Sequence, residues 1–80
     1  MLESEYQKKV IEKYEALGYY AIKLFKTNKN GIPDLLLLKK DDVIFVEVKA
    51  KKTTHAPLQK YRASELKAHG FTVLLDRSAL

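Results

Sequence analysis

The chain has 80 residues, 46% of them hydrophobic, and carries a formal net charge of +5. A chain of this length forms one hydrophobic core, so we predict a single domain over residues 1–80. The absence of cysteine excludes disulfides and cysteine-ligated zinc, and no apolar run approaches the ~18 residues of a membrane span. We therefore expect a cytoplasmic protein without membrane contacts. The positive charge favours a polyanionic partner, although it could also serve solubility alone.

The first predicted element is a helix from Leu2 to about Leu17, which Gly18 ends. Its apolar residues recur at helical spacing and form one face: Tyr6, Val10, Tyr14 and Leu17. We interpret this stripe as part of the core rather than as a binding platform.

A strand is predicted next, over Tyr19–Lys26. Both of its faces are largely apolar, which favours a sheet that is covered on both sides. The following segment, Thr27–Gly31, has the composition of a loop and ends shortly before Asp34. Lys29 in this loop is a candidate DNA contact, although a plain turn is the simpler explanation of the composition.

Two apolar runs, Asp34–Leu38 and Val43–Val48, flank the charged tetrapeptide Lys39–Asp42. The second run is rich in β-branched residues, and the first is too short for an ordinary helix. We therefore predict a β-hairpin. Pro33 cannot donate a ladder hydrogen bond, so it fits the first position of the first strand of this hairpin.

The hairpin brings charged residues together at one end. A symmetric turn pairs Leu36 with Phe45 and Asp34 with Glu47, and alternation of side chains puts Lys49 on the same face. Two carboxylates ~4 Å apart at an effective dielectric constant of about 20 repel by roughly 4 kcal/mol. A divalent cation such as Mg²⁺ would offset this repulsion better than Lys49 alone. The alternative is a buried ion cluster without chemistry.

The segment after Lys49 adds Lys51 and Lys52 beside the acidic pair. We interpret these lysines as a phosphate clamp, with a solvated loop as the alternative. His55 in the same segment is either a proton shuttle or, more simply, a surface residue.

Pro57 begins a second predicted helix, which runs to about His69 and is ended by Gly70. Phe71–Leu75 is the last predicted strand, and Asp76–Leu80 is a fraying tail. The element order is therefore αβββαβ. We predict an α/β fold in which three strands form an antiparallel meander and the last strand lies parallel to the third. The helices then cover both faces of a mixed four-stranded sheet.

The motifs in this order resemble a known family. Residues 31–34 read G-I-P-D, twelve residues follow, residues 47–49 read E-V-K, and P-L-Q at 57–59 opens the second helix. This set resembles the PD-(D/E)XK nucleases and, among them, the VRR-NUC (virus-type replication-repair nuclease) group, over about residues 3–75. The resemblance implies a restriction-endonuclease-like core and a DNA endonuclease that depends on Mg²⁺ or Mn²⁺.

The resemblance also implies roles for individual residues. Asp34 and Glu47 would be catalytic metal ligands, joined by the backbone carbonyl of Val48. Lys49 would position the attacking water and help to neutralise the phosphate. Gln59 matches the family's glutamine after P-L, which implies a place near the metal.

A further implied ligand is a glutamate on the first helix, for which Glu3 and Glu5 are the candidates. Residues seven apart lie ~20° from the same helical stripe, so Glu3 lies in line with Val10, whereas Glu5 lies ~140° away. We therefore predict Glu3 as the third acid, although both acids could instead only complement the helix dipole. Gln7, ~60° from Val10, is a candidate for the edge of the site.

Lysines outnumber arginines thirteen to two, which favours recognition of the DNA backbone and shape over recognition of base sequence. The predicted DNA contacts are Lys29, Lys51, Lys52 and Lys60. The resemblance implies branched DNA such as Holliday junctions as the substrate, and a homodimer. Two other functions stay open: a non-catalytic nucleic-acid-binding module with the same fold, and an interaction protein whose ion cluster only specifies the fold. A binding module would hold DNA equally well in EDTA and never cleave it.

Overall fold

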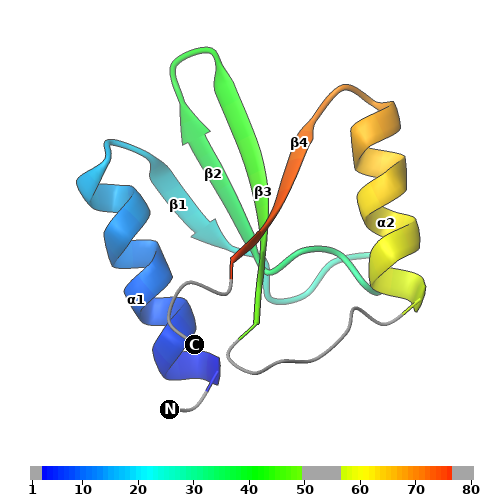
Figure 1. Cartoon of the computed structure of the whole chain (residues 1–80), viewed down its shortest axis with the longest axis horizontal. Helices are drawn as coiled ribbons and strands as arrows, with labels where there is room; N and C mark the ends of the chain where they lie inside the picture. The colour runs from blue at the N-terminus through cyan, green and yellow to red at the C-terminus, as the bar shows by residue number, and fades with distance from the viewer. Residues whose placement is uncertain (1–2, 50–56, 77–80) are drawn as a thin grey trace.

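The computed structural model describes residues 3–49 and 57–76, apart from the side chain of Glu3. These residues form the predicted αβββαβ series (Figure 1), with the elements α1 (Glu3–Ala16), β1 (Tyr20–Lys23), β2 (Leu35–Lys39), β3 (Asp42–Val48), α2 (Pro57–Ala68) and β4 (Thr72–Asp76). Neither described helix has the length and apolar composition that crossing a membrane requires.

The four strands form one mixed sheet in the order β1-β2-β3-β4. β2 pairs antiparallel with both β1 and β3, and α2 is the crossover that lets β4 lie parallel to β3. Leu36 lies opposite Phe45, which confirms the predicted hairpin register. The mixed four-stranded sheet confirms the predicted α/β fold class. The hairpin turn consists of Lys40 and Asp41, and Asp41 has a positive φ of 62°, in the left-handed region that Asp and Asn adopt more readily than most residues.

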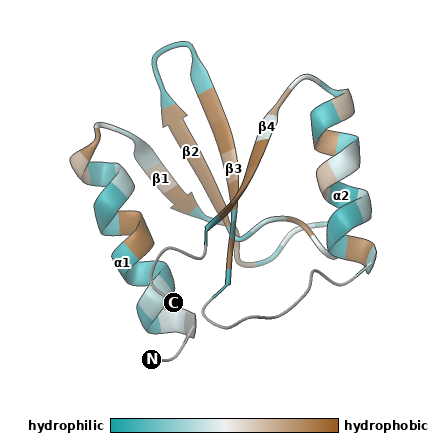
Figure 2. Ribbon diagram, in the orientation of Figure 1, coloured by the Kyte–Doolittle hydropathy of each residue, from teal (hydrophilic) through white to brown (hydrophobic). Residues whose placement is uncertain are grey.

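The core lies between α1 and one face of the sheet. Its members are buried side chains of α1, β2 and β3: Tyr6, Val10, Leu35, Leu37, Val46 and Val48. Because side chains alternate along a strand, Leu36, Phe45 and Glu47 face the other side, where α2 lies. α2 has no fully buried residue, and Figure 2 shows it as a mixture of polar and apolar positions beside apolar strands. The two helices therefore cover opposite faces, and α2 covers its face less completely.

At two of the element ends that differ from the sequence prediction, apolar residues are left exposed. β1 ends at Lys23 rather than Lys26, and Phe25, predicted on a covered face, is 89% exposed. α1 ends at Ala16, so Leu17 lies beyond the helix and is 57% exposed instead of packing on the sheet. In both places apolar residues continue the pattern past the point where the sheet and the helix can cover them.

Asp76 is the clearest correction, because it was predicted in a fraying tail. It is the last residue of β4 and is 6% exposed. Its Oδ1 atom accepts a hydrogen bond of 2.6 Å from the hydroxyl of Tyr6, and its Oδ2 atom accepts one of 2.7 Å from Nζ of Lys13. Its backbone oxygen accepts a hydrogen bond of 3.0 Å from the nitrogen of Lys49. Asp76 therefore ties α1 to the end of β3.

Candidate functional site

The described site residues come together where β3 ends. Glu47 and Lys49 lie at this end of β3, Asp34 directly precedes β2, and Gln59 lies in the first turn of α2. Figure 1 shows the start of α2 and the N-terminal part of α1 at the same end of the molecule. Four distant parts of the chain therefore converge on one region.

Asp34 lies in the plane of the sheet rather than on one of its faces. Its Oδ2 atom accepts a hydrogen bond of 2.8 Å from the backbone nitrogen of Val48. The ladder pair that the sequence predicts between Asp34 and Glu47 is not formed, because β2 begins one residue later, at Leu35. The carboxylate thus takes the place of a carbonyl at the end of the β2–β3 ladder.

Pro33 affects the hydrogen bonding of the Val48 backbone carbonyl. The N–H and C=O groups of a strand residue point to the same neighbouring strand, and the N–H of Val48 points towards Asp34. The ladder pairs end with Leu35 and Val46, and extending their register by two residues would bring Pro33 opposite Val48. Pro33 has no N–H, so it cannot donate to the Val48 carbonyl. The family-implied metal ligand therefore receives no hydrogen bond from Pro33.

Glu47 is a buried carboxylate with two polar side chains around it. It is 3% exposed, and its Oε1 atom accepts a hydrogen bond of 3.0 Å from Nε2 of Gln59. The ammonium group of Lys49 lies 3.8 Å from the same oxygen, and the Lys49 side chain is 14% exposed. Burial of a carboxylate is costly unless such groups compensate it. These contacts fix the orientation of Glu47 and keep positive charge beside it.

A close approach between the loop before Asp34 and α2 positions Gln59. Gly31 has a φ of 81°, and a Cβ atom there would lie 2.8 Å from Cγ of Leu58 and 3.2 Å from the Leu58 backbone. Nε of Arg62 donates a hydrogen bond of 2.9 Å to the carbonyl of Asn30. The glycine of the G-I-P-D motif therefore allows the first turn of α2 to come close enough for Gln59 to reach Glu47.

Only some of the other predicted site residues belong to the described part of the chain. Glu3 is the first residue of α1, but its side chain is outside the described set, as are Lys51, Lys52 and His55. Glu5 is exposed, as predicted. Lys29 is exposed and lines a hollow of about 220 Å³ formed by the loop before Asp34.

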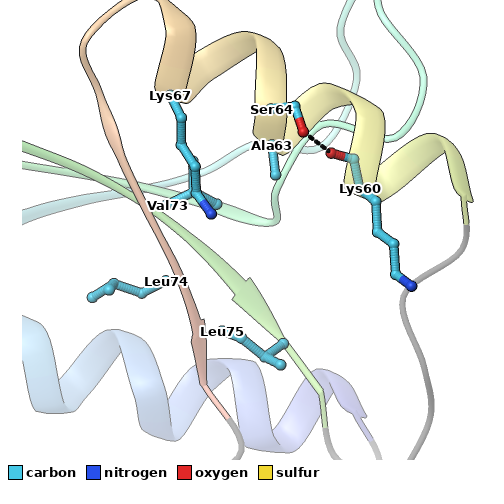
Figure 3. A pocket seen from close by; sticks show the side chains of 7 residues that line it. All are labelled: Lys60, Ala63, Ser64, Lys67, Val73, Leu74 and Leu75. Atoms are coloured by element: carbon cyan, nitrogen blue, oxygen red, sulfur yellow. Dashed lines mark hydrogen bonds between the residues drawn. The ribbon is translucent and has the colours of Figure 1, made fainter.

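Lys60 is also exposed and lines a groove of about 310 Å³ between α2 and β4. Figure 3 shows Lys60 and Lys67 on the α2 side of this groove, with Leu74 and Leu75 on the β4 side. None of the described residues that line it is acidic. The groove therefore presents positive charge next to the turn that carries Gln59.

Gln7 is more deeply buried than a place at the edge of the site implies. Gln7 is only 8% exposed, and its buried Oε1 atom has no hydrogen-bond partner among the described residues. Its position near the predicted apolar stripe was the signal available from the sequence, but helical spacing alone cannot show that an amide oxygen is left unpaired.

The oxygen atoms at this end of the sheet are suitable ligands for a hard cation such as Mg²⁺. Within residues 3–49 and 57–76, no group of three or more acidic, histidine or cysteine side chains could hold a metal ion. However, Mg²⁺ commonly takes only one or two carboxylates and completes its shell with water and phosphate oxygens. Asp34, Glu47 and the Val48 carbonyl provide such an oxygen set, and Gln7 provides a buried oxygen that still lacks a donor. The residues therefore fit Mg²⁺ or Mn²⁺.

Comparison with known proteins agrees with this geometry. No family model and no curated protein matches the sequence. Among solved structures, one described as a VRR_NUC domain matches with a TM-score of 0.83 and 34% sequence identity, covering 96% of this chain and 85% of that one. Since fold and sequence agree over most of both chains, this protein belongs to the VRR-NUC family and has its nuclease-type fold.

Proposed function

We propose that this protein is an endonuclease that hydrolyses DNA phosphodiester bonds with Mg²⁺ or Mn²⁺. The observation that carries this proposal is the hydrogen bond from Val48 to Asp34, which holds one carboxylate beside the strand segment that carries Glu47 and Lys49. A nuclease of this kind needs two acids and a cation within reach of one phosphate. The family membership supports the same reaction class.

Asp34, Glu47 and the Val48 carbonyl would hold the ion, and Glu3 is a further candidate ligand on α1. When bound, the ion would lower the pKa of a coordinated water and stabilise the charge that develops on the phosphate. The protein prepares this arrangement in advance, because Gln59 fixes Glu47 through a hydrogen bond of 3.0 Å. The orientation of the ligand therefore needs no rearrangement when DNA arrives.

Lys49 supplies positive charge on the substrate side of the acidic pair. Its ammonium lies 3.8 Å from Glu47, which is longer than a hydrogen bond, so a phosphate oxygen or a water can compete for it. In the reaction, the water oxygen forms a new P–O bond as the bond to the leaving oxygen breaks. The water proton goes to solvent, and the leaving oxygen takes up a proton. Lys49 would orient that water and offset the negative charge of the phosphate.

DNA would reach this site along basic surfaces on the α2 side. Lys29 and Lys60 are exposed there, and Lys51 and Lys52 lie between them in the sequence. A body of 32 × 28 × 21 Å can contact only one side of a duplex. A branched substrate such as a four-way junction, cut by a two-fold homodimer with one site for each strand, would match this limited contact area.

The test is a cleavage assay on labelled duplex, flap and four-way junction DNA, each with Mg²⁺, Mn²⁺ or EDTA. We expect cuts only with a divalent ion, and preferentially on the branched substrates. Equal DNA binding in EDTA without any cleavage would instead identify a non-catalytic binding module. Light scattering in parallel reports the assembly, and a monomer with undiminished junction cleavage would contradict the homodimer.

A further inference from the structure

Gln7 presents a buried acceptor whose requirement for a donor is not met. The residue is 8% exposed, and within residues 3–49 and 57–76 its Oε1 atom has no hydrogen-bond partner. An unsatisfied buried polar atom destabilises a fold, and nearly all such atoms in folded proteins are paired with protein groups, water or ions. A buried oxygen that no described group of the chain pairs with is therefore a candidate for binding a water molecule or an ion.

The contacts of α1 show which way Gln7 points. Tyr6 and Lys13 on one flank of the helix bond to Asp76 at the end of β4. Tyr14 on the other flank packs edge-to-face on Tyr19, just before β1, with ring centroids 5.8 Å apart. Gln7 is seven residues before Tyr14 and thus lies within about 20° of the same stripe. Gln7 therefore faces the β1–β2 side of the sheet.

The position along the helix axis brings Gln7 to the site. Seven helical residues span about 10 Å, which equals about three residues of a strand. Because β1 runs back along α1, this step leads from the level of Tyr20, which pairs with Leu38, to the level of Lys23, which pairs with Leu35. The residue before Leu35 is Asp34. In Figure 1 the N-terminal part of α1 lies at the same end of the sheet as the end of β3.

Asp34 can be reached from this side because its carboxylate lies in the plane of the sheet. Its bonded oxygen, Oδ2, points to the nitrogen of Val48 at the end of the ladder. A group on the α1 face can therefore approach a ligand of Asp34, while Glu47 and Lys49 approach it from the α2 face.

We propose that Oε1 of Gln7 accepts a hydrogen bond from a water molecule of the hydrated divalent ion that Asp34 and Glu47 hold. This inference rests on the metal-dependent function proposed above. Mg²⁺ gives up its waters reluctantly, so a buried acceptor beside the site holds the ion without replacing its hydration shell. Gln7 is then a positioning residue, which acts through that water rather than by touching the reacting phosphate.

If Gln7 positions the hydrated ion, removing its side-chain oxygen should stabilise the metal-free protein but weaken metal binding. Gln7→Met removes the unpaired oxygen at similar volume, so the melting temperature in EDTA should rise by roughly 4–8 °C. The same variant should bind Mn²⁺ about tenfold more weakly in a calorimetric titration, as happens when other groups that orient a metal shell are lost. Gln7→Glu keeps an oxygen and adds charge, so it should bind Mn²⁺ at least as tightly while melting lower in EDTA.

Ile11→Val is the matched control, because it trims a partly buried residue one turn along α1 without touching an oxygen. It should lower the melting temperature slightly and leave Mn²⁺ affinity unchanged. Unchanged Mn²⁺ affinity in Gln7→Met would overturn the role of Gln7 and leave the nuclease proposal standing. A fall in both stability and affinity in Gln7→Met would reduce Gln7 to a packing residue. If the parent protein takes up no Mn²⁺ at all, both proposals fail together.

Discussion

The side chain of Asp34 accepts a hydrogen bond of 2.8 Å from the backbone of Val48, the residue between Glu47 and Lys49. The N–H of Val48 thus donates to this carboxylate instead of to a backbone carbonyl of the neighbouring strand. The first acid of the site is thereby held by the strand that carries the second acid and the lysine. The geometry of the site therefore depends on how the β2–β3 hairpin ends.

Two substitutions at Asp34 should separate its structural contribution from its chemical one. Asp34→Asn keeps an oxygen for the Val48 N–H, so we expect a melting temperature close to that of the parent but loss of Mn²⁺ binding and cleavage. Asp34→Ala leaves that N–H unsatisfied and should also lower the free energy of unfolding by about 1–3 kcal/mol. Thermal melts and calorimetric titrations of both variants check this. Tight Mn²⁺ binding by Asp34→Asn would be inconsistent with Asp34 as a ligand.

Gly31 and Gly70 offer a matched pair for testing the approach of α2. Both have positive φ, 81° and 92°, but a Cβ at Gly70 meets nothing within 4 Å, whereas one at Gly31 meets Leu58 at 2.8 Å. Gly70→Ala should lose only the roughly 1–2 kcal/mol of left-handed strain. Gly31→Ala should lose about 1–3 kcal/mol more through overpacking, and it should reduce cleavage because Gln59 moves away from Glu47. Equal losses in stability and activity for the two variants would refute this role.

The lysines on the site side should set the salt dependence of DNA binding. Replacing both Lys29 and Lys60 by Ala should reduce the slope of log affinity against log salt by about 0.9 for each duplex phosphate contact that is lost. Replacing the exposed Lys8 and Lys9 of α1 removes the same charge from the opposite side of the sheet and should change the slope less. Fluorescence anisotropy across a salt series measures both. Identical slopes for the two double variants would place the DNA elsewhere.

The link between α1 and β4 should weaken at alkaline pH. The hydrogen bond to Asp76 raises the pKa of Lys13 above its usual value of 10.5. Because the folded-state pKa is the higher one, the stabilisation is complete below the unfolded pKa and is lost as pH rises through the folded pKa. Lys13→Gln should melt lower at neutral pH and lose less stability on going to alkaline pH. Burial also raises the pKa of Tyr14, so some alkaline loss should persist in this variant.

Lys9→Gln is the control for that experiment, because it leaves the pair of Lys13 and Asp76 intact. It should follow the parent protein through the alkaline range. Thermal melts at a series of pH values measure both variants, and an alkaline loss in Lys13→Gln as large as that of the parent would show that the pair contributes nothing to α1 docking.

The hairpin register followed from local signals that the sequence contains in full. Apolar runs on both sides of Lys39–Asp42 leave little choice of pairing, since a slip by one residue would turn every buried side chain to the other face. The order of the elements and the crossover of α2 followed from the same periodicities. The sequence also indicated that Gly31 ends a loop, but it could not show that this residue meets Leu58.

The parts that the sequence did not predict depend on contacts between distant residues. The sequence predicted Asp76 to be part of a fraying tail, because its partners, Tyr6 and Lys13, lie at the other end of the chain. The shift of Asp34 into the plane of the sheet depends on the position of the Val48 nitrogen, which no pattern of residue types records. The unpaired oxygen of Gln7 likewise appears only once α1 is packed on the sheet.

The most direct test of the proposed site compares the parent protein with Glu47→Gln and Lys49→Ala on a labelled four-way junction, with Mg²⁺ or EDTA, at protein concentrations that saturate the DNA. Anisotropy measures binding to the same DNA, and a calorimetric titration measures Mn²⁺ uptake. We predict that the parent cleaves only with Mg²⁺, that Glu47→Gln loses both Mn²⁺ uptake and cleavage, and that Lys49→Ala takes up Mn²⁺ but does not cleave. Cleavage by Glu47→Gln at the rate of the parent would contradict the account.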